Sequence, residues 1–189
     1  MYKLASLAFY CHFCLAFIGA APKGHETSII REFGPCDGLR KTPFHLERIT
    51  ANVTGRGATT FNGNIDVDED LDHISNMEIK VDKCSSYSDL GSCEYYSSYK
   101  FTDPCETIMC LTEGPWAAIF HTKPPLTCPV KKGSYGLHQS SVKPSYLALP
   151  NMSGNVYWKF SMKLLIGKRV VACVKGGIEK AVIRSKSKT

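Results

Sequence analysis

The sequence predicts an all-β fold of antiparallel strands cross-linked by disulfides. Three observations lead to this prediction: apolar and polar residues alternate over 155–167, only one short stretch has helical character, and cysteines are frequent. The chain has 189 residues, a formal net charge of +6 and 43% hydrophobic residues. This composition is typical of a globular protein, and the length favours one domain.

Residues 1–21 are expected to be a secretory signal peptide, which leaves residues 22–189 as a single mature domain. A basic residue, Lys3, precedes the apolar run 4–18, and small residues follow at 19–21. A membrane anchor is the alternative interpretation. The run is short for spanning a bilayer and has no strongly basic flank, so we favour cleavage.

The clearest strand prediction is 155–167, "NVYWKFSMKLLIG". Its large apolar side chains occupy every second position, which places them on one face of a sheet. These residues are Val156, Trp158, Phe160, Met162 and Leu164. A partner strand is expected within 167–183, "GKRVVACVKGGIEKAVI", with a hairpin turn at Gly167-Lys168 and a bulge at Gly176-Gly177.

Weaker strand signals precede this hairpin, and they contain more polar interruptions. The expected strands are 45–54, 59–67, 73–84 and 93–101, and a further strand begins near Tyr135. One short helix is expected over 103–111, with Asp103 as its N-cap and Pro104 in its first turn.

Loss of the signal peptide would leave seven of the nine cysteines and would remove the "CHFC" motif at 11–14. In an oxidising compartment the remaining cysteines indicate a disulfide framework, and their odd number leaves one cysteine unpaired or paired between chains. Two sequons also favour passage through the secretory pathway, and they predict glycosylation at Asn52 and Asn151. The protein is therefore expected to be secreted and extracellular, or lysosomal.

The cysteine order and several short motifs together resemble the ML lipid-recognition superfamily, and most closely the GM2-ganglioside activator family. The motifs are "CDG" at 36–38, "ANVTG" at 51–55, "GSCEYY" at 91–96, "CPVKKGSY" at 128–135 and "LLIGKRVVACVKGGIE" at 164–179. The resemblance extends from about residue 33 to 183 and rests on their order and spacing.

The resemblance implies an immunoglobulin-like β-cup, in which two antiparallel sheets enclose an apolar lipid cavity. It also implies the disulfides Cys36–Cys173, Cys84–Cys93 and Cys105–Cys128. Cys110 is then expected to be free, because the family's partner cysteine is replaced by Leu126-Thr127. A Cys110–Cys128 pairing remains the alternative.

The inward faces of the strands are expected to line the cavity. The predicted lining residues are Ile79, Val81, Val156, Trp158, Phe160, Met162 and Leu164. The alternative is that these side chains pack against one another as an ordinary core. The segment 111–126 carries Trp116, Ile119 and Phe120, which are expected to contact a membrane or lipid; a loop folded back over the core is the alternative.

The resemblance, together with the apolar strand face, implies a lipid-binding or lipid-transfer protein rather than an enzyme. It would carry or present a glycolipid, sphingolipid, phospholipid or fatty acid, contact membrane surfaces peripherally, and activate a lipid hydrolase without being one. No cofactor and no nucleic-acid partner are expected. The alternative is a secreted chemosensory, immune or venom-type binding protein that acts through protein partners or small hydrophobic ligands.

Catalytic and metal motifs are not apparent in the sequence. It contains no GxSxG, HExxH or P-loop pattern, so no catalytic residue is assigned. Zinc binding by Cys105, Cys110, His121 and Cys128 is disfavoured in a secreted chain. The acidic run at 66–72 lacks the EF-hand glycine and terminal glutamate, so it indicates a solvated turn rather than a calcium site.

Overall fold

The computed structural model describes residues 24–39, 42–53, 59–107, 109, 122–142 and 156–184. It confirms the all-β prediction. The strands are β1 Gly24–Pro35, β2 Phe44–Val53, β3 Thr59–Val67, β4 Asn76–Cys84, β5 Glu94–Thr102, β6 Gly133–Val142, β7 Tyr157–Ile166 and β8 Arg169–Arg184. The helical elements are the short α2, Pro104–Thr107, and a 3-10 turn, Leu90–Ser92.

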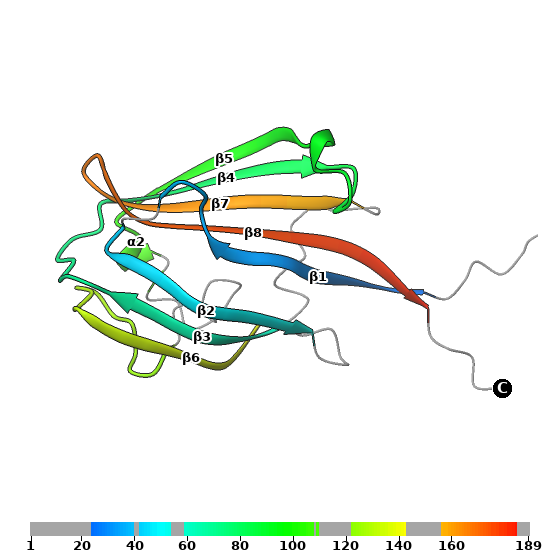
Figure 1. The fold of residues 1–189 in the computed structure, drawn as a ribbon. Coiled ribbons are helices and arrows are strands. Elements are labelled where there is room, and N and C mark those ends of the chain that lie inside the picture. The colour runs from blue at the N-terminus through cyan, green and yellow to red at the C-terminus, as the bar shows by residue number, and fades with distance from the viewer. Residues whose placement is uncertain are drawn as a thin grey trace, which may run out of the picture. The chain divides into compact units, whose positions relative to one another are not determined.

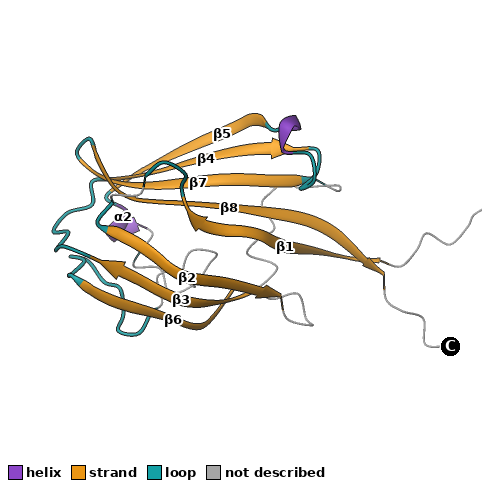
Figure 2. Ribbon diagram, in the orientation of Figure 1, coloured by secondary structure: helices purple, strands orange, loops and turns teal. Residues whose placement is uncertain are grey.

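The strand residues that fall within the compact unit Thr27–Ala181 form two antiparallel sheets (Figures 1 and 2). The larger sheet has the strand order β1-β8-β7-β4-β5, and the smaller has the order β2-β3-β6. One apolar cluster takes residues from both sheets, including Ile65 and Leu137 of the smaller sheet and Met77 and Leu164 of the larger. The core therefore lies between the two sheets.

The strand register explains how the inner face of the larger sheet is built. In antiparallel pairs, residues directly opposite each other project from the same face. Ile79 of β4 lies opposite Met162 of β7, and Val81 lies opposite Phe160. The alternation seen in the sequence thus becomes a continuous apolar surface across neighbouring strands.

The hairpin between β7 and β8 turns at Gly167-Lys168, as predicted, and Gly167 has a positive φ of 59°. The predicted bulge at Gly176-Gly177 is wrong, because the irregularity in this pair lies at Leu164/Leu165. The two glycines instead make room for aromatic rings. A Cβ on Gly176 would collide with Phe160, and one on Gly177 would collide with Tyr157.

The part of the chain that the structure describes contains three disulfides: Cys36–Cys173, Cys84–Cys93 and Cys105–Cys128. These are the pairs that the family resemblance implied. Cys36–Cys173 joins the end of β1 to its neighbour β8, and Cys84–Cys93 closes the connection from β4 to β5. Cys110 lies outside the described residues, so the prediction that it is free stays a prediction.

Candidate functional site: the apolar layer between the sheets

The structure brings all seven predicted lining residues together in the layer between the sheets. Ile79, Val81, Trp158, Met162 and Leu164 are buried members of the main apolar cluster. Val156 and Phe160 are partly buried and pack against it. They face the smaller sheet, which contributes its own buried residues, Phe44, Ile65, Val67, Tyr135 and Leu137.

Along one edge, β1 closes this layer. Phe61 of β3 and Ile178 of β8 form a second buried cluster, with Ile30 and Phe33 of β1 packed against them. The rings of Phe33 and Phe61 lie 5.0 Å apart. Because β1 and β3 belong to different sheets, this aromatic contact joins the two sheets directly.

Charged side chains reinforce the same edge on the outer surface. The ammonium group of Lys175 on β8 lies 2.9 Å from Glu32 of β1 and 2.9 Å from Asp37, which follows β1. These hydrogen-bonded carboxylates, Glu32 first, raise the pKa of Lys175. Nearby, burial raises the pKa of Tyr157 to about 12, and the negative charge of Glu32 adds to the effect. The edge is held by a disulfide, an apolar cluster and ion pairs.

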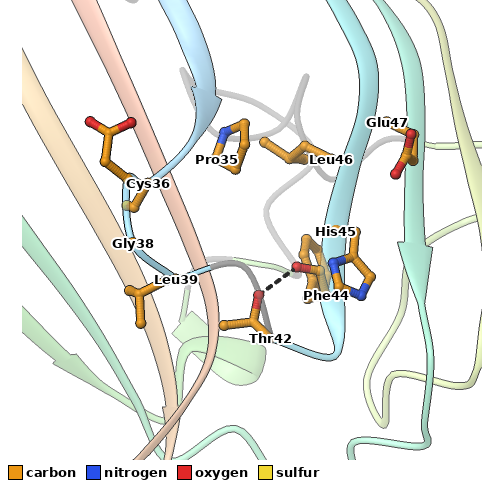
Figure 3. A pocket seen from close by; sticks show the side chains of 10 residues that line it. Pro35, Cys36, Gly38, Leu39, Thr42, Phe44, His45, Leu46 and Glu47 are labelled. Carbon is orange, nitrogen blue, oxygen red and sulfur yellow. Dashed lines mark hydrogen bonds between the residues drawn. The ribbon is translucent and has the colours of Figure 1, made fainter.

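A hollow of about 420 Å³ opens between the end of β1 and the start of β2 (Figure 3). Its lining residues are Pro35, Cys36, Asp37, Gly38, Leu39, Thr42, Phe44, His45, Leu46 and Glu47. In Figure 3 the side chain of Leu46 on β2 points toward Pro35 at the end of β1. Phe44 and Leu46 also belong to the main apolar cluster or pack against it, so the hollow borders the layer between the sheets.

Local hydrogen bonds fix the walls of this hollow. The hydroxyl of Thr42 donates to the carbonyl of Phe44 over 3.0 Å, and His45 Nε2 lies 2.7 Å from Asp68 Oδ2. Sequence patterns place Cys36 in a disulfide and 45–54 in a strand, but they assign none of the lining residues to a ligand site. The "GPCDG" turn at 34–38 was the available signal, since Gly38 has a positive φ of 79°.

The opposite edge of the larger sheet is open. Tyr99 of β5 lies opposite Ile79 and therefore shares its inward face. Ile79 is 6% exposed, whereas Tyr99 is 49% exposed. Tyr96, also 49% exposed, contacts buried Trp158 edge-on, with ring centres 4.7 Å apart. The aromatic inner surface thus extends beyond the covered core.

A second hollow, of about 450 Å³, lies over β4, β5 and β7. Its lining residues are Glu78, Ile79, Lys80, Tyr95, Ser98, Tyr99, Lys100, Ser161 and Lys163. Most of these alternate with the inward-facing residues, so this hollow lies on the outer surface. It shares Ile79 with the predicted lipid site but otherwise consists of residues outside that set.

The acidic run at 66–72 is paired with basic residues rather than simply solvated. Glu69 contacts Arg169 over 2.6 Å, and Asp70 contacts Lys131 over 2.9 Å. The backbone N–H of Lys132 and the side chain of Lys131 lower the pKa of Asp70. Asp70 in turn raises the pKa of Lys131, so this lysine is engaged within the protein.

Several predicted site residues lie outside the described residues: Trp116, Ile119 and Phe120 of the loop, and the sequon asparagine Asn151. Asn52 is described and exposed near the end of β2. Among the described residues, no group of histidine, cysteine or acidic side chains is arranged to hold a metal. Across the same ranges, no helix has the length and hydrophobicity needed to cross a membrane.

Comparison with known proteins adds no family. No protein-family model matches the chain, and no curated protein matches it.

Proposed function

We propose that the protein binds an acyl lipid in the apolar layer between its two sheets. The observation that carries this proposal is the hollow beside β2, because its walls continue into the cluster of predicted lining residues. At about 420 Å³ it has the size of a ligand pocket. Part of an acyl chain can lie in this hollow. The rest of the chain would take the place of contacts between apolar side chains on the inner faces of the two sheets.

Burial alone can supply the affinity. Each buried methylene contributes about 0.8 kcal/mol, so ten contribute roughly 8 kcal/mol before the entropy costs of binding. That is enough for micromolar binding without a charged anchor. In this proposal the protein is not a hydrolase: it carries or presents a glycolipid, sphingolipid or phospholipid, or activates an enzyme that degrades one.

The proposed location is extracellular or lysosomal. Three disulfides are compatible with an oxidising compartment, where such bonds persist. A protein-binding role is the second candidate. The exposed Tyr87, Leu90, Tyr95, Tyr96 and Tyr99 on β5 and the preceding turn favour it, because tyrosine is enriched at interfaces.

Native mass spectrometry of the purified, oxidised protein tests the lipid proposal, followed by extraction of whatever has co-purified. We expect one lipid per protein, either retained from expression or taken up from added phospholipid. Leu46→Trp should fill the hollow and weaken binding of long acyl chains more than short ones. Tyr95→Trp, at an exposed position outside the layer, is the matched control. A folded protein that takes up no lipid would overturn the proposal.

A further inference from the structure

Two polar side chains interrupt the apolar layer at the same end. The indole Nε1 of Trp158 and the hydroxyl of Thr59 are buried, and neither has a hydrogen-bond partner in the described part of the protein. Trp158 is 4% exposed and Thr59 is 0% exposed. Buried polar groups are normally hydrogen-bonded, so two such groups on facing sheets require an explanation.

Strand register places both groups on the inner faces. Trp158 lies directly opposite Ile178 of β8, and Ile178 packs against Phe61 of β3. Thr59 is two residues before Phe61 on the same strand and therefore shares its face. β3 and β7 both begin at the end of the layer where β2 and β4 finish (Figure 1), so Thr59 and Trp158 lie at that end on opposite sides.

The third unpartnered group, the hydroxyl of Tyr157, does not belong to this pair. Tyr157 precedes Trp158 on the strand and projects from the opposite face. Its ring covers Gly177 on the outside of the larger sheet. The pairing of Thr59 with Trp158 is thus specific to the space between the sheets.

We infer that the ligand carries a neutral oxygen acceptor, an ester or amide carbonyl, which Trp158 and Thr59 bind at this end of the layer. This inference rests on the proposed lipid-binding function. An indole N–H can only donate a hydrogen bond, so its partner must be an acceptor. The apolar neighbours Phe61 and Ile178 disfavour a charged group, because burying an unpaired charge is costly.

This arrangement gives the ligand a direction. The carbonyl lies where β3 and β7 begin, and the acyl chain runs from there toward the hollow near the start of β2. Outside the carbonyl, the headgroup would meet Lys83, which is exposed and lies 5.8 Å from the centre of the Trp158 ring. The carbonyl would satisfy donors that the ligand-free protein leaves unpaired.

The test compares two phosphatidylcholines of equal chain length, one diacyl and one dialkyl ether, which differ in their carbonyl groups. Binding is measured by titration from cyclodextrin into the full mature protein. We expect the diacyl form to bind about fivefold more tightly, the value of one ordinary net hydrogen bond. Thr59→Val and Trp158→Phe should abolish this preference, and Thr59→Ser, which keeps the hydroxyl, should retain it.

The outcomes separate the two proposals. Equal binding of the diacyl and ether lipids to the unmodified protein would overturn the carbonyl site and leave lipid binding intact. Binding of neither lipid would overturn the lipid proposal itself and the carbonyl site with it. Thr59→Val is nearly isosteric, so it remains informative if Trp158→Phe does not fold. A preference that survives both folded variants would also overturn the inference.

Discussion

The two edges of the larger sheet are built differently. At the β1 edge, inward-facing Phe33 packs against Phe61 of the other sheet, and the Cys36–Cys173 disulfide fixes β1 to β8. At the β5 edge, inward-facing Tyr99 is half exposed although its neighbour Ile79 is buried. One face of a single sheet is therefore covered at one edge and open at the other. Stability should therefore concentrate at the first edge, whereas the second leaves the tyrosine side chains of β5 exposed to solvent.

The largest expected effect on stability comes from removing the disulfide at the β1 edge. Replacing Cys36 and Cys173 by serine should lower the free energy of unfolding by about 4–5 kcal/mol, because the bond constrains a long loop in the unfolded chain. The control is the double serine variant at Cys84 and Cys93, where the shorter loop predicts a loss of about 2–3 kcal/mol. Their sequence separations are 137 and 9.

Urea unfolding under oxidising conditions measures both variants. Equal losses, or a larger loss at Cys84–Cys93, would contradict the idea that the closed edge dominates stability.

A smaller effect is expected from truncating inward-facing side chains at different distances from the open edge. Leu164 on β7 is 1% exposed, so Leu164→Ala should cost about 2–5 kcal/mol through lost burial and a new cavity. Tyr99→Ala on β5 should cost less than about 1 kcal/mol, because the side chain is already half in water. Chemical denaturation of ligand-free protein gives both values, and a comparable cost at Tyr99 would show that the β5 edge is covered in solution.

The smallest effect concerns the charges that link β1 to β8. Lys175→Gln should lower stability by less than about 1 kcal/mol at neutral pH, since partly exposed ion pairs contribute little. The raised pKa of Lys175 means that its contribution is complete below pH 10.5 and is lost as the pH rises through the folded-state value. The difference between the two proteins should therefore disappear at high pH.

Lys100→Gln is the control at the open edge, where Lys100 lies 3.7 Å from Glu78. Thermal unfolding between neutral and alkaline pH should show little difference for this variant. A larger pH-dependent loss of thermal stability for Lys100→Gln than for Lys175→Gln would contradict the stronger charge pairing that we assign to the β1 edge.

Much of this architecture is predictable because side-chain alternation is a local property. The strand 155–167 was recognised from its period of two, and the same pattern placed Trp158, Phe160 and Met162 on one face. The strand β1 was not predicted, because Ile29 and Ile30 are adjacent and the segment does not alternate cleanly. The disulfide pairs came from the family resemblance, since cysteine spacing alone does not determine connectivity.

The finer features depended on contacts that no local pattern contains. Gly176 and Gly177 resembled a bulge, whereas each accommodates a ring from β7. The hollow beside β2 forms where the chain passes from one sheet to the other, so its walls come from segments that only the fold brings together. The acidic run at 66–72 forms ion pairs with Arg169 and Lys131, which are distant in the sequence.

The strand order also determines when each strand can pair during synthesis of the chain. Within the described strands, β1 pairs only with β8. The first strand to be synthesised therefore cannot join a sheet until the last strand has been synthesised. Cys36 and Cys173 are 137 positions apart, and ribosomes add about 5–20 residues per second, so the Cys36 thiol waits roughly 7–27 s for its partner. During that interval it is open to wrong pairing with the cysteines that emerge in between. The late strand thus makes oxidative folding of this domain depend on a thiol that remains reduced, or on an isomerase that corrects premature bonds.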